Sequence, residues 1–496
     1  MSSPPFAPGV QPRPAAAARP PAPKPKRPPW TWLERFLIIQ AFIPVFLFVP
    51  GFSAGRIVIR MAVFLMGPAV WFAIVQSGRF KAGSSWDAVG LWLKLVAGWV
   101  VLTIFHWETR SILAAVVQAT FYVAVFSPVF WATKALGAPN QIGRLMAILL
   151  IANGISALVG LGQVFRPDTF NPPVIQGITG MAEDSLTVLA LTYTDQNGHK
   201  ILRPCGLTDS PGGASAAALA AVLIGLACAL RPIGTFRRLA CLALAFCGMA
   251  VTYYSQVRMV FVMEILCMGV LAGVFVLQKN FGYATVLGGL GAAMIVGALT
   301  WVMATSGRVV VERFLGLAER SFKESYEGSG RAGMVTNTLT VMMWDNPLGC
   351  GIGRWGPIAG AFGDPTDPGI WVEVMIPAWV ADGGIPLLLL YNIAIGLAML
   401  DTLRIALRSR DGDVRYWAAV VFALNLGVIA TCFSYVTFLT VIGMQFWFLA
   451  SIIHAADYLT RREAAAKARR APARPASSPP PRPPGPMPPP YPTAPA

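Results

Sequence analysis

Three arginines are the residues of this sequence best suited to chemistry at a phosphate group. Arg258 stands between two apolar segments, Arg331 opens a short helical segment, and Arg354 follows a glycine-rich turn. A guanidinium group matches the oxygens of a phosphate, and a helix N-terminus or a glycine turn adds backbone N–H donors for an anion. We therefore predict that Arg258, Arg331 and Arg354 bind an anionic group.

Glu373 is the carboxylate that could act beside these cations. It lies in GIWVEVMIPAWVADGGIPLLLL, an aromatic and aliphatic stretch at the predicted edge of a membrane span. A carboxylate in such a place suits a general base. A solvated interfacial glutamate is the competing interpretation, and the sequence leaves both open. Asp382, in the same stretch, could simply cap the following helix.

The longest polar segment between apolar spans positions two of the arginines. Helical spacing follows Arg331, with apolar residues at Val335, Leu339 and Met342. Asn346-Pro347 is predicted to end that helix, and glycines at 349, 351 and 353 predict a tight turn. The turn also matches G-x-G-x-x-G, but no strand precedes it, so we predict a close backbone approach to a ligand or to the membrane surface instead of a dinucleotide site.

Composition assigns the chain to membrane proteins. Of 496 residues, 55% are hydrophobic and only 12% are charged, and the mean hydropathy is +0.59. Such a chain is not an ordinary soluble protein. The net charge of +16 does not favour a nucleic-acid partner, because the basic residues gather in the two tails and in short loops.

The sequence predicts an all-α, polytopic membrane helix bundle at residues 30–460, with about twelve transmembrane helices of roughly 20 residues each. The predicted spans are 36–52, 57–76, 88–106, 112–131, 142–165, 214–230, 239–257, 259–277, 283–304, 385–403, 416–432 and 437–458. Two longer outer loops, at about 166–211 and 306–370, separate groups of spans. The second is predicted to be partly helical.

Charge in the short loops predicts the orientation. With the N-terminus in the cytoplasm, the inner loops hold the basic clusters expected there: Arg79, Lys81, Lys134, Arg144, Arg231, Arg237, Arg238, Lys279, Arg404, Arg408, Arg410 and Arg415. Arg56 and Arg60 are exceptions. Both termini are then cytoplasmic, and the tip at Arg258 and both long loops lie outside.

The tails, 1–29 and 461–496, are rich in proline and basic residues and are predicted to be disordered and cytoplasmic. The polyproline stretch at the end could bind a partner domain, although a solvated tether is the simpler interpretation.

No metal ligand spacing is present among the seven cysteines or the three separated histidines, and no cofactor is predicted. Cys205 and Cys350 fall in the two outer loops, where a disulfide is possible. Lys94 and Glu264 lie inside predicted spans, and we expect them to pair with other buried groups or to line a cavity.

Three segments resemble a known family. SQVR, which ends at Arg258, GRAGMVTNTLTVMMWDNPLGCGIG, which begins with Gly330-Arg331, and EVMIPAWVADGGIPLLLL are similar to motifs of the O-antigen ligase and polymerase superfamily of bacterial membrane glycan transferases. PCGLTDSPGGASAA resembles the family's first outer loop more weakly. The resemblance covers most of the second half of the chain.

The resemblance implies a glycosyltransferase of the bacterial cytoplasmic membrane. Its donor would be a polyprenyl-diphosphate-linked glycan and its acceptor a glycan or lipid-linked glycan, with membrane lipids and possible polysaccharide-assembly proteins as partners. The family's functional arginines fall on Arg258 and Arg331, and no metal or cofactor is implied. Arg354 is expected to assist them because of its place after the glycine turn. Glu373 stands where the family has a histidine, which favours a polymerase or a divergent member over a lipid A core ligase.

Two other classes remain open from the sequence. A transporter or flippase of lipid-linked sugars would also have about twelve spans and two inner termini, but we find no internal repeat, and arginines in an outer loop are unusual for alternating access. A non-catalytic assembly scaffold that uses its proline-rich tails is the third class.

Overall fold

The computed structural model describes residues 31–76, 86–173, 192–194, 200–208, 213–306, 330–470 and 485. Helices dominate, and the strands among these residues are one short antiparallel pair, β1 (Thr192–Thr194) and β2 (Lys200–Leu202). The all-α class is therefore confirmed. The predicted tail at 1–29 and the loop residues 307–329 lie outside the described residues.

The helices follow one another with short connections. In chain order they are α1 (Trp32–Phe42), η1 (Ile43–Phe48), η2 (Phe52–Gly55), α2 (Arg56–Gln76), α3 (Asp87–Thr103), α4 (Ile112–Phe126), α5 (Pro128–Ala135), α6 (Gln141–Phe165), α7 (Pro167–Phe170), α10 (Gly213–Leu230), α11 (Thr235–Ser255), α12 (Arg258–Leu277), α13 (Phe281–Ser306), α16 (Arg331–Asn337), η3 (Thr338–Met342), α17 (Met343–Asp345), α18 (Gly356–Phe362), α19 (Met375–Arg408), α20 (Gly412–Ala430), η4 (Thr431–Phe433), η5 (Thr437–Leu439) and α21 (Val441–Arg470).

Nine helices in the described residues are long and apolar enough to cross a membrane, which is the pattern of a multi-pass membrane protein. The count of twelve is not confirmed. The other three predicted spans fall on α1 with η1, on α3 and on α21. The first helix has only 11 residues because Pro44 follows within the 3-10 segment η1, and α3 has 17 residues.

Two helix boundaries differ from the prediction. α19 begins at Met375, before the predicted start at residue 385, and a kink at Gly383-Gly384 interrupts it. α21 continues to Arg470, past the predicted domain boundary at residue 460. Residues 461–470, RREAAAKARR, are strong helix formers without proline, so this last helix extends into the predicted tail.

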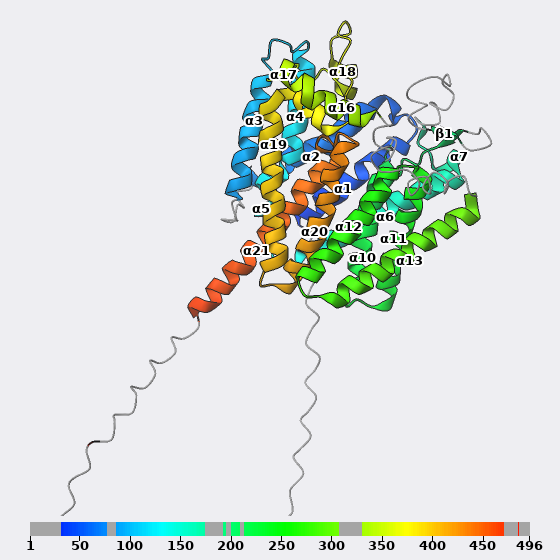
Figure 1. Cartoon of the computed structure of the whole chain (residues 1–496), viewed down its shortest axis with the longest axis vertical. Helices are drawn as coiled ribbons and strands as arrows, with labels where there is room; N and C mark the ends of the chain where they lie inside the picture. Colours follow the sequence, from blue (N-terminus) through cyan, green and yellow to red (C-terminus); the bar gives the residue numbers. More distant parts are fainter. Residues whose placement is uncertain are drawn as a thin grey trace, which may run out of the picture.

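Side-chain contacts place several helix ends together at one end of the bundle. Gln278 Nε2 donates to the Ala406 carbonyl at 2.7 Å and to the Arg415 carbonyl at 3.4 Å. Arg231 Nη1 pairs with Asp413 Oδ1 at 2.8 Å. The junctions 231–234, 278–280 and 409–411 therefore share this end, and we call it the basic end (lower end of Figure 1).

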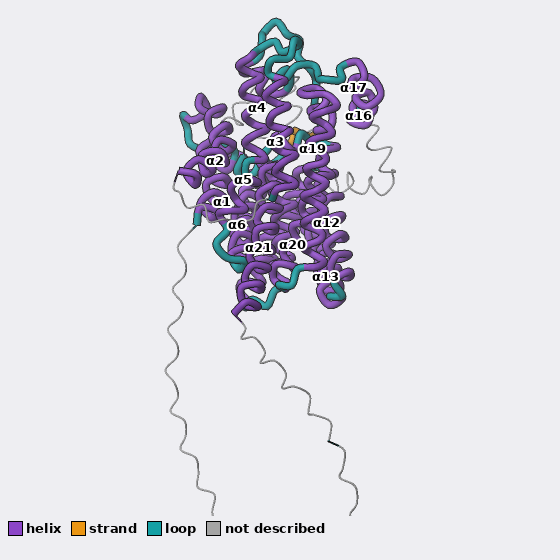
Figure 2. The backbone as a smooth tube through the Cα atoms, turned by 90° about the vertical axis from the view of Figure 1, so that its left-hand side faces the viewer, coloured by secondary structure: helices purple, strands orange, loops and turns teal. Residues whose placement is uncertain are grey.

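The opposite end holds α16, α17 and α18, and we call it the loop end (upper end of Figure 1). Figure 2 shows α16 and α17 projecting from one side of the bundle at this level. Between the two ends, an aromatic cluster of Trp379, Tyr391, Phe438 and Trp447 joins α19 to α21 in the core.

Candidate functional site

Three of the four predicted site residues, Arg331, Arg354 and Glu373, share the loop end. Arg258 is the first residue of α12, whose last turn lies at the basic end, so Arg258 lies away from the basic end. Arg331 is the first residue of α16. Glu373 immediately precedes the N-cap of α19, Val374, and α19 runs from the loop end to the basic end. Arg354 precedes α18 by two residues.

Arg331 and Glu373 are in direct contact. Arg331 Nε donates to Glu373 Oε2 at 3.2 Å, which joins the start of α16 to the start of α19. The two side chains are 39% and 37% exposed, so both are accessible from solvent. A pair this exposed contributes little to stability. The contact therefore places a cation and a carboxylate side by side at a solvent-accessible position.

The helix that begins at Arg331 has the predicted start and end. It passes through α16, a π-helical turn at η3 and α17, and it ends before Asn346-Pro347. The predicted apolar face is different, because Leu339 is 40% exposed and Thr338 is buried. A π-helical turn holds an additional residue, and this changes the direction in which the following side chains point.

The short backbone segment before Arg258 is tightly turned. Gln256 has a left-handed backbone with φ of +56°, and its Nε2 donates to the Tyr253 carbonyl at 2.9 Å. Glutamine in this conformation costs free energy that glycine would avoid. The turn lets α11 and α12 follow each other with hardly any loop, and it fixes where the half-buried Arg258 leaves the backbone.

Arg354 is engaged by the protein itself. Its Nε and Nη2 donate to Asp367 at 2.7 and 2.9 Å, and its Nη1 donates to the Cys350 carbonyl at 2.8 Å and to Glu108 at 3.4 Å. The Arg354 guanidinium lowers the pKa of Asp367 through these hydrogen bonds. These contacts hold the loop that follows Arg354. They occupy its guanidinium group, so Arg354 is not positioned to bind a phosphate.

The glycine turn is formed as predicted, but it approaches the chain's own backbone. Gly349, Gly351 and Gly353 all have positive φ. A Cβ on Gly351 would lie 2.5 Å from the Glu108 carbonyl oxygen. A Cβ on Gly353 would lie 2.7 Å from the carbonyl carbon of Ala114. Only glycine fits positions this close to another backbone, so the turn packs against α4 and the segment before it instead of a ligand.

Hydrogen bonds to Asp382, which lies in α19, join the glycine turn to α4. The carboxylate is fully buried and accepts from Gln118 Nε2 at 3.0 Å, Tyr122 Oη at 2.9 Å, Trp355 Nε1 at 2.9 Å and the Gly353 backbone N–H at 3.4 Å. Asp382 therefore does not cap a helix, which was the simpler interpretation of this residue. All of these partners are donors, so Asp382 serves as a shared acceptor for α4 and the glycine turn.

The kink in α19 completes this arrangement. Gly384 has φ of +64° and ψ of −155°, which breaks the helix. The freed backbone groups find partners: Trp99 Nε1 donates to the Gly383 carbonyl at 2.8 Å. The Cys350 N–H donates to the Ala381 carbonyl at 2.8 Å, and the Ile385 N–H donates to the Pro347 carbonyl at 2.9 Å. Broken helices persist at membrane depth only when such groups are satisfied.

We expect Gly384→Ala to lower the free energy of unfolding by about 2–3 kcal/mol, because a non-glycine residue at this φ is strained. The added Cβ would also overlap the Pro347 carbonyl oxygen. Thermal unfolding of the purified protein, followed by tryptophan fluorescence, measures the effect. Gly360→Ala is the matched control, since nothing lies within 4 Å of its Cβ position. Equal midpoints for the two variants would contradict the role assigned to the kink.

The remaining predicted residues do not form a second site. Lys94 is exposed on α3, whereas Glu264 is buried in α12 and accepts from Thr252 Oγ1 at 2.8 Å, so the two are not partners of each other. In the described residues no disulfide joins any of the cysteines, so Cys205 and Cys350 are separate. The described ranges contain no group of three or more His, Cys, Asp or Glu residues placed to hold a metal ion.

Sequence reasoning missed Glu108, Asp367, Gln118 and Tyr122, which support the site from other segments. Gln118 and Asp382 are 264 positions apart, and Glu108 and Arg354 are 246 apart. Glu108 and Asp367 lie in polar segments that no motif marks. The visible signal was Asp382 itself, a carboxylate followed by two glycines inside an apolar stretch, which requires buried donors.

Comparison of the sequence with protein-family models gives no match, and comparison with curated proteins gives no significant match either.

Proposed function

We propose that this protein is an integral membrane glycosyltransferase of the O-antigen ligase and polymerase type. It would transfer a polyprenyl-diphosphate-linked glycan to an acceptor hydroxyl at the outer face of the bacterial cytoplasmic membrane. The observation that carries the proposal is the accessible contact between Arg331 and Glu373 at the loop end. Arg258 also lies away from the basic end.

The proposed reaction needs a cation for the leaving group and a base for the acceptor. The acceptor oxygen attacks the anomeric carbon of the donor glycan, and the bond between that carbon and the phosphate oxygen breaks. Arg258 and Arg331 bind the diphosphate and stabilise the negative charge that it gains on leaving. Glu373 takes the proton from the acceptor hydroxyl. The products are the extended glycan and polyprenyl diphosphate.

Arg354 has a positioning role in this proposal. Its bidentate pair with Asp367 holds the segment that leads from the glycine turn to Glu373, and the Ile370 N–H donates to the Arg354 carbonyl at 2.9 Å. Arg354 thereby fixes the approach to Glu373 without contact to the diphosphate. The polyprenyl chain of the donor lies among the apolar spans.

The distribution of charge supports the proposed orientation. The basic end gathers Arg231, Lys279 and Arg415 close to one another through the contacts of Gln278 and Asp413. Positively charged short loops remain in the cytoplasm. The loop end then faces outward, away from nucleotide sugars, and both termini are cytoplasmic.

Reconstitution of the full chain in proteoliposomes tests the function. With a polyprenyl-diphosphate-linked glycan as the only substrate, we expect a longer glycan and free polyprenyl diphosphate to appear without nucleotide. An acceptor series separates a polymerase, which extends lipid-linked glycan, from a ligase. Movement of intact donor between leaflets with no change of glycan length would contradict the proposal and indicate a flippase.

A further inference from the structure

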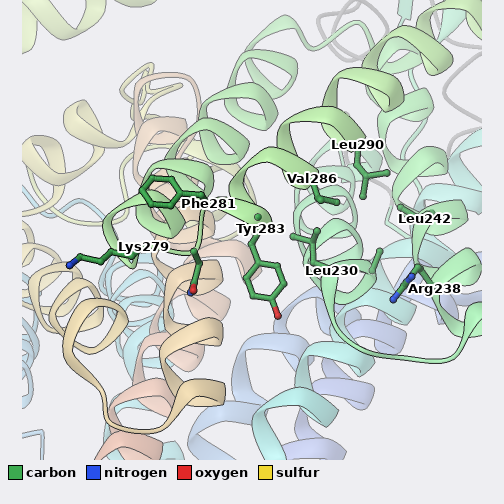
Figure 3. A pocket seen from close by; sticks show the side chains of 11 residues that line it. Leu230, Arg238, Leu242, Lys279, Phe281, Tyr283, Val286 and Leu290 are labelled. Atoms are coloured by element: carbon green, nitrogen blue, oxygen red, sulfur yellow. The ribbon is translucent and has the colours of Figure 1, made fainter.

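A groove opens at the basic end between α10, α11 and α13. It has a volume of about 960 Å³, and its walls are largely apolar, with Leu230, Leu242, Val286 and Leu290 among the residues that line it. Arg238 and Lys279 stand at its edges on either side of Tyr283 (Figure 3). Its position is the end of the bundle opposite the contact between Arg331 and Glu373.

Arg238 and Lys279, the two cations of the groove, differ from the nearby Arg231 in the groups that they contact. Arg231 pairs with Asp413 and lies over the ring of Tyr416 at 5.2 Å. Within the described part of the chain, no carboxylate pairs with Arg238 or Lys279, and Arg238 Nη2 donates only weakly, to the Arg231 carbonyl at 3.4 Å. The positive charge at the groove is therefore not neutralised by these residues.

Lys279 occupies a backbone position that usually holds glycine or asparagine. It follows the last turn of α12 with φ of +62°, and the Asn280 N–H donates to the Phe275 carbonyl at 2.8 Å, as in a helix end of the Schellman type. A lysine here costs roughly 1 kcal/mol relative to glycine. Figure 3 shows its side chain reaching outward from the edge, where its flexible stem can turn toward a ligand.

The apolar walls indicate that the ligand has a hydrocarbon part. Phe281 and Val286 are 61% and 50% exposed beside the groove, on a helix that is apolar enough to cross a membrane. A soluble anion would leave this surface uncovered. A lipid chain can cover it, and the neighbouring arginine and lysine can bind a phosphate at the same time.

We propose that this groove binds an anionic glycerophospholipid of the adjoining leaflet. Its headgroup lies along the edge of the groove that holds Arg238, Tyr283 and Lys279, and an acyl chain lies along Leu242, Val286 and Leu290. Basic pockets between membrane helices at the cytoplasmic side are suited to such headgroups. The proposal does not depend on the transferase function, because it concerns other residues at the other end of the bundle.

Native mass spectrometry of the full chain in detergent tests this site. We expect bound phosphatidylglycerol on the wild type, and about 30-fold weaker binding by the double variant Arg238→Gln/Lys279→Asn. Asparagine tolerates the left-handed backbone at 279. Arg410→Gln is the matched control, since Arg410 is an exposed cation at the same end and does not line the groove; its binding should equal that of the wild type.

Val286→Trp separates a lipid from a free anion. Tryptophan would fill the apolar part of the groove and leave both cations in place. We expect weaker binding of phosphatidylglycerol and no change in binding of inorganic phosphate. Equal affinity for phosphatidylcholine, undiminished lipid binding by the double variant, or an unaffected Val286→Trp protein would each overturn the proposal.

Discussion

Arg331→Ala is expected to reduce glycan transfer by at least about 100-fold, with an unchanged amount of protein in the membrane. Arg258→Ala should have an effect of the same size. Loss of one preorganised group that stabilises developing negative charge costs about 10²–10³ in rate. Both arginines are the first residues of their helices, and neither side chain belongs to the buried core. Release of polyprenyl diphosphate in the reconstituted system measures the loss.

Three further variants make this result specific. Arg110→Ala is the matched control, because Arg110 is an exposed cation at the loop end, with a side chain 55% exposed and 3.7 Å from Glu108. Arg331→Lys keeps the charge but not the planar fork, so intermediate activity is expected. Glu373→Gln removes the proposed base and keeps both arginines, so it should also lower transfer strongly. Full polymer yield from both Arg258→Ala and Arg331→Ala would refute the assignment.

Local sequence predicted part of this fold. Nine of the twelve predicted spans coincide, within the described residues, with helices long and apolar enough to cross a membrane, because a span must present roughly 20 apolar residues to the bilayer. The helix that begins at Arg331 and ends before Asn346-Pro347 also depends on neighbours in sequence. Hydropathy did not predict the length of the first helix correctly. α1 has only 11 residues because Pro44 follows it in η1. No local pattern revealed the π-helical turn that exposes Leu339.

The candidate site was only partly predictable, because its geometry depends on long-range contacts. Sequence indicated that Arg354 is a cation near a glycine turn, but the pair with Asp367 and the contact with Glu108 follow from folding. The glycine pattern predicted close approach without indicating the partner, which is backbone of α4 and of the α19 kink. Contact between Arg331 and Glu373 joins two segments that the sequence had marked separately.

Asp382→Ala should have the largest effect on stability, a loss of about 4 kcal/mol in the free energy of unfolding. Its carboxylate is the common acceptor for the side chains of Gln118, Tyr122 and Trp355. Removing a buried acceptor leaves donors unsatisfied, at about 1–3 kcal/mol for each group, with partial relief as the site relaxes. Thermal unfolding followed by tryptophan fluorescence measures the loss.

Asp345→Ala is the matched control, since Asp345 is exposed at the end of α17 and its loss should change stability by less than about 0.5 kcal/mol. A double-mutant cycle with Trp355→Phe tests the specific contact. If Asp382 accepts from the indole at 2.9 Å, Trp355→Phe should cost less in the Asp382→Ala protein than in the wild type.

Limited proteolysis of the Asp382→Ala protein tests whether the Asp382 carboxylate also holds the segment that leads to Glu373. The carboxylate holds the Gly353 N–H and Trp355, and Arg354 between them binds Asp367 on the way to Glu373. We expect cleavage between residues 349 and 370 to become faster than in the wild type, while α20 and α21 remain protected. Unchanged cleavage there, together with a wild-type unfolding midpoint, would show that the turn keeps its place without the carboxylate. In that case the position of Glu373 would depend on the contact with Arg331 and on the start of α19.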